Sequence, residues 1–209
     1  MTPDGSPAGS AHTEDSAPGE GGWIGIEESA RLLGAYAWVE GRLFDVLGAL
    51  AADEPSDRLA VLLDSSSQEH AWHAELLAEH IPLLPGTSPD AFVTAPGPEA
   101  AEVLDRLGRL PGGAQRAAAL ARVVLPRLEA GYRRHFFRAS PMSDGPVRRA
   151  LRLVLSDEVE ARLEMEEALE GLLSGVADRG GVLDEAARLA EPVAGWGPGF
   201  APWPGGQGT

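Results

Sequence analysis

The sequence predicts an all-α protein, a four-helix bundle of two antiparallel hairpins joined by a long crossover. Three observations support this prediction. Apolar residues recur at three- and four-residue intervals, the period of one face of a helix, and no window alternates as a strand would. Pro and Gly clusters divide the pattern into four long segments. The turns inside each pair are short and the link between the pairs is long, as a bundle with one crossover requires.

The first hairpin is expected near the start of the helical region. Its first helix should run over about 27–53, where Pro55 ends it. The second should run over about 56–80 and stop before Pro82. Its opening Ser56 belongs to the residue types favoured at helix N-termini. The turn between the two helices is short, so we expect them to be antiparallel neighbours.

The second hairpin contains a proline within its first helix. That helix is expected over about 114–138, and Pro126 should kink it or split off its first turns, because proline lacks the donor for one ladder hydrogen bond. The next helix should start near Pro146 and run to about residue 176. Shorter elements complete the prediction: a connection over 83–98 and short helices at about 99–110 and 183–190.

The two chain ends are expected to differ from the bundle, which occupies 23–191. Residues 1–22 are small, acidic or helix-breaking, so they cannot bury enough apolar surface to offset the entropy of ordering, and we expect a disordered arm. The C-terminal tail, 192–209, is rich in Gly and Pro and contains three aromatic residues: Trp196, Phe200 and Trp203. Docking onto the body and binding of a partner are both open for this tail.

Composition narrows the classes of partner and ligand. The 209 residues include 17 basic side chains, all Arg, against 32 acidic ones, a net charge of −15 that disfavours nucleic acid. No apolar stretch approaches the roughly 20 residues of a membrane span, and no secretory signal is visible, so we expect a cytoplasmic protein that does not enter membranes. Without Cys, any metal must be held by His and carboxylates.

Four acidic residues interrupt the apolar stripes, one in each long helix: Glu40, Glu69, Glu129 and Glu158. Glu69 follows Glu40 by 29 residues, and Glu158 follows Glu129 by the same interval, so comparable turns would place all four at one level. Burying unpaired carboxylates is costly, and four of them together would repel one another. A metal cation between them would remove that repulsion, and a carboxylate–imidazole ligand set suits iron or manganese.

Two histidines accompany the acid of the second helix. Glu69 and His73 are one turn apart; alternatively, His70 and His73 form a His-x-x-His pair in which His70 replaces the acid. The fourth helix has no imidazole at the corresponding place. Arg162 follows Glu158 by one turn and could pair with it in place of a second cation.

At these residues the chain resembles the ferritin-like superfamily of carboxylate-bridged dimetal proteins, over about residues 27–176. In that family the first helix of each pair contributes a Glu and the second a Glu-x-x-His. The resemblance implies a di-iron or di-manganese centre, with Trp72 and Tyr132 walling the site. Tyr132 is expected to act either as a hydrogen-bond donor beside the ligands or as a radical sink. The implied metal ligands are Glu40, Glu69, His70, His73, Glu129 and Glu158.

The function that the resemblance implies is a non-haem oxidase or hydroxylase that uses O₂ or peroxide on a small molecule. Two alternatives remain open. One is an iron-handling homo-oligomer. The other is a metal-free binding or scaffold bundle, with the carboxylates paired to Arg42, Arg133 or Arg162. Phosphate-binding and Schiff-base chemistry are disfavoured, because the chain has no Gly-rich phosphate loop and no Lys.

Overall fold

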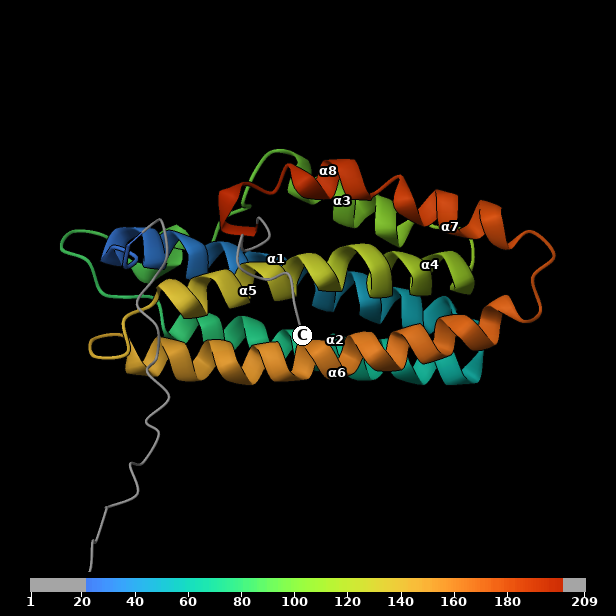
Figure 1. Ribbon diagram of the computed structural model, residues 1–209, viewed down its shortest axis with the longest axis horizontal. Helices are drawn as coiled ribbons and strands as arrows, with labels where there is room; N and C mark the ends of the chain where they lie inside the picture. The colour runs from blue at the N-terminus through green and yellow to red at the C-terminus, as the bar shows by residue number, and fades with distance from the viewer. Residues whose placement is uncertain (1–21, 201–209) are drawn as a thin grey trace, which may run out of the picture.

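The computed structural model describes residues 22–200, and this part of the chain is all-helical, as predicted. Its only β-pairing is an isolated bridge between Leu84 and Thr87. Four long helical segments run along the long axis of the molecule (Figure 1). They are α1 (Ile26–Asp53), α2 (Asp57–Glu79), the run of α4 (Gly113–Ala119), η2 (Leu120–Val124) and α5 (Leu125–Arg138), and α6 (Gly145–Leu173).

Helix α1 packs along α2, and α5 packs along α6, while α2 also contacts α6. The α1–α2 connection is short because Glu54 leaves the helical conformation (φ −81°, ψ 120°) and Pro55 follows it. The hydroxyl of Ser67 on α2 donates a hydrogen bond of 2.8 Å to the backbone oxygen of Phe44 on α1. This bond, and the small size of the buried Ser66 and Ser67, allow the two helices to approach closely.

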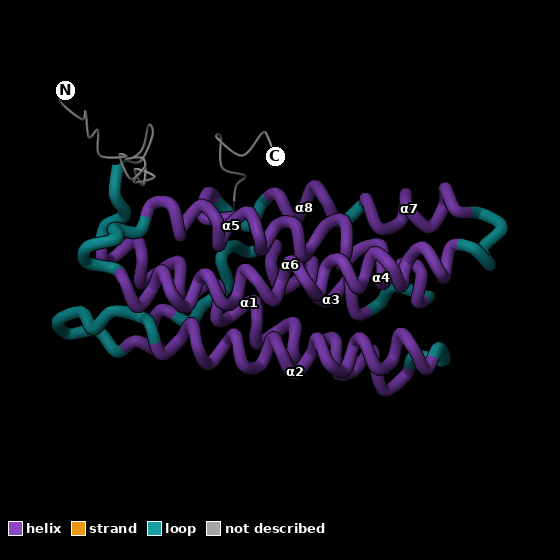
Figure 2. The backbone as a smooth tube through the Cα atoms, turned by 60° about the horizontal axis from the view of Figure 1, so that its bottom comes forward, coloured by secondary structure: helices purple, strands orange, loops and turns teal. Residues whose placement is uncertain are grey.

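The short elements lie against the long ones: η1 (Pro89–Phe92) and α3 (Glu99–Gly108) on α1, α7 (Arg179–Ala187) on α4, α8 (Ala190–Ala194) on α3, and η3 (Pro198–Phe200) on α5. Figure 2 shows α7 and α8 on the side of the molecule away from α2. Helix α7 begins at Arg179, earlier than the sequence predicted. The reason is that the Asp178 side chain accepts a hydrogen bond of 2.9 Å from Gly181 N–H, which offsets the helix-breaking tendency of the Gly180–Gly181 pair.

Pro126 modifies its helix without breaking it. The preceding segment η2 is a π-helical turn, in which the N–H of Leu125 bonds to the carbonyl of Leu120, five residues back. Pro126 has no N–H to return to Arg122, and its ring needs space at that carbonyl, so the wider turn accommodates it. The run from α4 to α5 therefore stays continuous through Pro126, which lies about one turn before Glu129.

The connection predicted at 83–98 crosses α1 in direct backbone contact. A Cβ atom added to Gly34 would lie 2.0 Å from the carbonyl oxygen of Phe92. Only glycine leaves room for this crossing, because every other residue would place a carbon inside the carbonyl. The contact fixes the middle of the connection against the N-terminal half of α1.

The C-terminal segment is packed into the core up to the last described residue. Trp196 and Phe200 are each 1% exposed, and Tyr36 Oη donates to the Gly131 oxygen at 3.1 Å and lies 3.4 Å from that of Gly199. The boundary predicted between 191 and 192 falls inside α8, so residues 192–200 belong to the folded body. Trp203 and the predicted arm, except for residue 22, lie outside the described residues.

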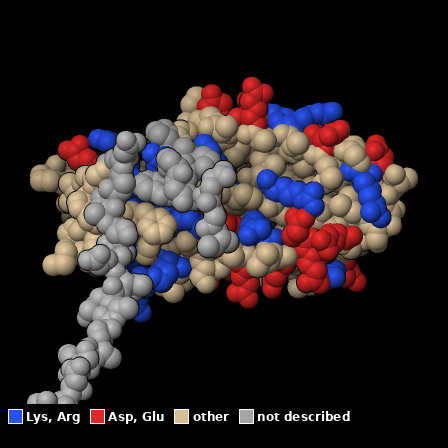
Figure 3. Space-filling view, in the orientation of Figure 1, with Lys and Arg blue, Asp and Glu red and all other residues tan. Residues whose placement is uncertain are grey.

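The surface of the described region is strongly acidic along one helix. Figure 3 shows Asp and Glu side chains gathered where the C-terminal half of α6 lies, and its exposed acids are Glu160, Glu164, Glu167 and Glu170. None of the helices described between residues 22 and 200 combines the length and apolar character needed to cross a membrane.

Candidate metal centre

Three long helices bring four buried side chains to one point in the core. Helix α1 contributes Glu40, α2 contributes His70 and His73, and α6 contributes Glu158. None of the four side chains is more than 3% exposed. One potential ligand atom from each residue lies within 4.8 Å of the corresponding atoms of the other three. His70 and His73 share a face of α2 because they are three residues apart.

Glu40 is held by two neighbours. Its Oε2 is in close contact with His70 Nδ1, and its Oε1 accepts a short hydrogen bond from Tyr132 Oη on α5. Burial and the nearby Glu40 raise the pKa of Tyr132 well above its ordinary value, so the phenol keeps its proton and acts as a donor. Tyr132 therefore contacts the cluster as a donor to Glu40, and the choice between its two expected roles stays a prediction.

His73 is oriented by a carboxylate outside the cluster. Its Nε2 lies 3.2 Å from Asp157 Oδ2, while its Nδ1 faces inward, 3.2 Å from Glu158 Oε1 and 3.6 Å from Glu40 Oε2. An imidazole that donates one N–H to a carboxylate presents its other nitrogen in a fixed direction. This arrangement is typical of metal-binding histidines.

Three buried polar atoms of the cluster lack a hydrogen-bond partner within the described part of the chain. They are both carboxylate oxygens of Glu158 and Nδ1 of His73. The separation of His73 Nδ1 from Glu158 Oε1 is short, but the atoms are not aligned for a hydrogen bond. Buried polar atoms are rarely left without partners. A cation between them would satisfy all three.

The electrostatics of the metal-free cluster show the same deficit of positive charge. Burial, and then the charge of Glu40, raise the pKa of Glu158. Burial alone would also raise the pKa of Glu40, but His70 and His73 outweigh it and hold that pKa well below its usual range. Burial would lower the pKa of His73, yet Glu158 and Glu40 raise it to about 11. Without a metal ion, protons on the imidazoles compensate the carboxylates.

Two of the six ligands predicted from the sequence are placed elsewhere. Glu69 is on an exposed face of α2, and the adjacent His70 occupies the position in the core. Glu129 is buried on α5, but its Oε1 accepts a hydrogen bond of 2.5 Å from Arg162 Nε. The sequence suggested that Arg162 pairs with Glu158; in the structure it pairs with Glu129 and leaves Glu158 to the cluster.

Trp72 contributes less to the site than expected. Its ring centroid lies 5.4 Å from that of His73, so it covers one side of that imidazole. It is also 44% exposed, so it does not wall the cluster as a buried residue would. Asp157 is the residue that sequence reasoning missed. The only available signal was its position next to Glu158.

His135 is buried outside the cluster, near the end of α5. Its Nε2 lies 3.1 Å from the hydroxyl of Ser29 on α1, and its Nδ1 has no partner among the described residues. Burial, and then the charge of Arg138, lower the pKa of His135 to about 3. The imidazole is therefore neutral in the folded protein at physiological pH.

We expect His135 to make stability fall in weak acid. Its pKa is about 3 in the folded state and about 6.5 in an unfolded chain, so between these values only the unfolded chain binds the extra proton. Stability should therefore be fully present above pH 6.5 and decrease by up to about 1.4 kcal/mol per pH unit as the pH falls towards 3. Urea unfolding of the wild type and of His135→Gln between pH 6.5 and 5 checks this. The difference between their unfolding free energies should change by about that amount per unit, and parallel profiles would contradict the assignment.

Comparison of the chain with protein-family models, with curated protein sequences and with solved structures finds no match. The interpretation of the cluster therefore depends on its own chemistry and geometry.

Proposed function

We propose that this protein binds one divalent transition-metal ion, iron or manganese, through Glu40, His70, His73 and Glu158. The observation that carries the proposal is the set of buried atoms on Glu158 and His73 that accept or donate no hydrogen bond within the described chain and converge on the same point as Glu40 and His70. In a metal-free core these atoms would be a net cost to folding. A bound cation would coordinate these atoms and so stabilise the folded protein.

The dimensions of the cluster suit a metal ion. Bonds of about 2.0–2.2 Å to nitrogen and oxygen place ligand atoms on opposite sides of the ion about 4.4 Å apart at most. The four atoms lie within 4.8 Å of one another, so small side-chain movements would complete the coordination. Two carboxylates and two imidazoles match iron and manganese, and zinc accepts the same ligand types.

One ion is favoured over two. The second position of a dimetal centre would need Glu129, which is already neutralised by Arg162, and Glu69, which is exposed. The positive charge that a second cation would place beside Glu129 is already supplied by the guanidinium of Arg162. The carboxylate–guanidinium pair is bound directly, at 2.5 Å.

We further propose that the chain is a ferritin-like bundle and a non-haem oxidase or hydroxylase acting on a small molecule. Support for the fold comes from the four long helical segments, with ligands on α1, α2 and α6 and Tyr132 on α5. Bound iron or manganese would supply redox chemistry with O₂ or peroxide. Asp157 would hold His73 in place, and Tyr132 would orient Glu40 and retain a proton beside it.

The test is metal analysis of protein purified after expression with iron or manganese, followed by anaerobic titration with Fe²⁺, Mn²⁺ and Zn²⁺. We expect one ion per chain in the wild type. Glu40→Ala combined with His73→Ala should reduce the bound metal to background. Fe²⁺-loaded protein should consume O₂, and the double variant should not.

Matched control variants separate the proposals. Glu69→Gln and Glu129→Gln should each retain one ion per chain, because neither carboxylate belongs to the cluster. Two ions per chain in the wild type, lost in Glu129→Gln, would instead establish a dimetal centre. Background metal in the wild type would exclude the metalloprotein and leave the metal-free bundle. Metal-loaded protein that assembles into a large shell would favour iron handling.

A further inference from the structure

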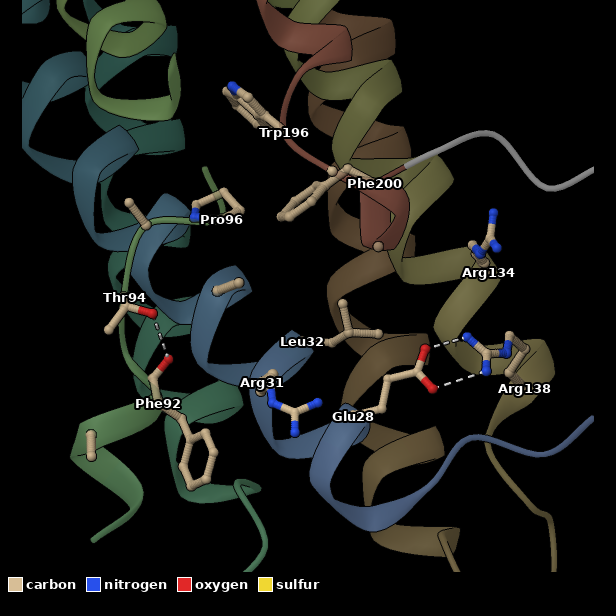
Figure 4. Close-up of a pocket in the computed structure, with 15 residues that line it drawn as sticks. Glu28, Arg31, Leu32, Phe92, Thr94, Pro96, Arg134, Arg138, Trp196 and Phe200 are labelled. Carbon is tan, nitrogen blue, oxygen red and sulfur yellow. Dashed lines mark hydrogen bonds and ion pairs between the residues drawn. The ribbon is translucent and has the colours of Figure 1, made fainter. Parts of the chain in front are cut away.

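A second feature of the molecule is a cavity of about 520 Å³ that is separate from the metal cluster. Figure 4 shows the elements that line it. The N-terminal half of α1 forms one side, the connection around Phe92 and Pro96 a second, the C-terminal segment around Trp196 and Phe200 a third, and α5 the fourth. Its volume lies within the range of about 300–1,000 Å³ that is usual for small-molecule sites.

Most of the cavity wall is apolar. Leu32, Phe92, Pro96, Trp196 and Phe200 line it, and three of these side chains are aromatic. Trp196 and Phe200 are fixed in place, since they pack edge-on against one another with ring centroids 5.5 Å apart and are buried. Rigid aromatic walls of this kind bind flat or elongated apolar groups at low entropic cost.

The other part of the cavity is basic. It is lined by Arg31, Arg134 and Arg138, with Glu28 as the acid between them (Figure 4). Arg138 is occupied by Glu28, which it contacts through two nitrogens at 2.5 and 3.0 Å. Arg31 pairs with Glu27 at 3.1 Å on the surface.

Arg134 is the cation of this group that forms no ion pair, although with Arg138, whose contribution is larger, it helps to lower the pKa of Glu28. The structure records neither an ion pair nor a hydrogen bond from its guanidinium to any residue between 22 and 200. The side chain is only partly exposed. A guanidinium that is not hydrogen-bonded to any described carboxylate thus lines an apolar cavity in a protein whose net charge is −15.

We propose that this cavity binds a small amphipathic monocarboxylate, with its apolar body against Trp196 and Phe200 and its carboxylate on Arg134. A planar guanidinium matches a carboxylate through two parallel hydrogen bonds. One guanidinium without an ion pair can bind one carboxylate, and the strongly anionic protein disfavours larger polyanions. The apolar wall selects against inorganic anions, because they have no apolar surface to pack against it.

The cavity and the metal cluster are separate sites, connected only through a row of packed aromatic rings. Phe200 packs on Tyr36 with ring centroids 5.1 Å apart, Tyr36 packs on Tyr132 at 4.8 Å, and Tyr132 bonds to Glu40 in the cluster. The proposed ligand contacts none of the metal ligands. Its binding can therefore be measured in metal-free protein, and the result does not depend on the proposed metal site.

The test is isothermal titration calorimetry of the full chain in a chelating buffer, with 2-naphthoate and its neutral analogue 2-naphthamide as probes. We expect one naphthoate per chain. Arg134→Gln should weaken naphthoate binding by about tenfold to a hundredfold, the loss of a charge-assisted hydrogen bond in a partly desolvated site. Arg134→Lys should weaken it less, because the charge is retained. Binding of 2-naphthamide should be weak and unchanged by either substitution.

Two further variants keep the test specific. Arg133, the residue before Arg134 on α5, is exposed and does not line the cavity. Arg133→Gln removes the same charge and should leave naphthoate binding unchanged. Ala95 is exposed on the connection and lines the cavity. Ala95→Phe should narrow the cavity and weaken the binding of both probes. No naphthoate binding by the wild type, or equal losses in Arg133→Gln and Arg134→Gln, would overturn the proposal. Unchanged circular dichroism is required of each variant.

Discussion

Saturating metal should raise the melting temperature of the wild-type protein by about 5–10 °C and leave that of Glu158→Gln unchanged. At a free-metal concentration a hundred times the dissociation constant, binding stabilises the folded state by about 2.7 kcal/mol. For a chain of this size, each kcal/mol corresponds to about 2–4 °C. Gln has the shape of Glu but no charge, so the site would lose one of its two anionic ligands. Differential scanning calorimetry with and without metal measures the shift.

Without metal, Glu158→Gln should not destabilise the protein. Burial and the neighbouring Glu40 raise the pKa of Glu158, which shows that its charged form is unfavourable there. A neutral amide removes that repulsion. Metal-free Glu158→Gln should therefore be at least as stable as metal-free wild type, which separates a lost ligand from a damaged core.

Glu69→Gln is the matched control for this experiment, since it removes the same charge from an exposed position on α2. It should retain the full metal-dependent shift. A shift that survives in Glu158→Gln, or that disappears in Glu69→Gln, would place the ion elsewhere.

Gly34→Ala should destabilise the protein by about 3 kcal/mol. The added methyl group would lie 2.0 Å from the carbonyl oxygen of Phe92, and both partners are backbone, so no side-chain rotation relieves the clash. Either α1 shifts or the connection leaves it, and overpacking of this kind costs about 1–3 kcal/mol or more. Chemical unfolding of metal-free protein measures the loss.

Gly41→Ala on the same helix provides the control with opposite sign. A Cβ atom at Gly41 meets no atom within 4 Å. Alanine should stabilise α1 there by up to about 1 kcal/mol, because it restricts the unfolded chain and favours the helix. If both substitutions changed stability equally, the close crossing of α1 by the connection would be contradicted.

The helices were predictable because their signals are local. The three-and-four spacing of apolar residues, together with the positions of Pro55, Pro82 and Pro146, is contained in short windows of the chain. The start of α7 was misplaced because the side chain of Asp178 caps a segment that its glycines alone would disfavour. For residues 192–200 the sequence leaves docking onto the body open, because their composition does not show the surface on which Trp196 and Phe200 pack.

The candidate site was predictable only in part. Glu40, His70, His73 and Glu158 were among the proposed ligands, since each interrupts an apolar stripe or lies beside one. The choice between Glu69 and His70 depends on the rotation of α2 about its own axis, because adjacent helical residues point in directions about 100° apart. That rotation is set by packing against α1 and α6 together.

By itself, the sequence determined that the described chain is helical, where most of its helices begin and end, and that any metal would be held by carboxylates and imidazoles. Tertiary structure alone decided that Arg162 neutralises Glu129, that Asp157 orients His73 and that Arg134 lines an apolar cavity without forming an ion pair to a described residue. The physical reason is range. Helix formation follows from neighbours a few residues apart, whereas the pairing of buried charges depends on which side chains three or four packed helices bring within hydrogen-bonding distance.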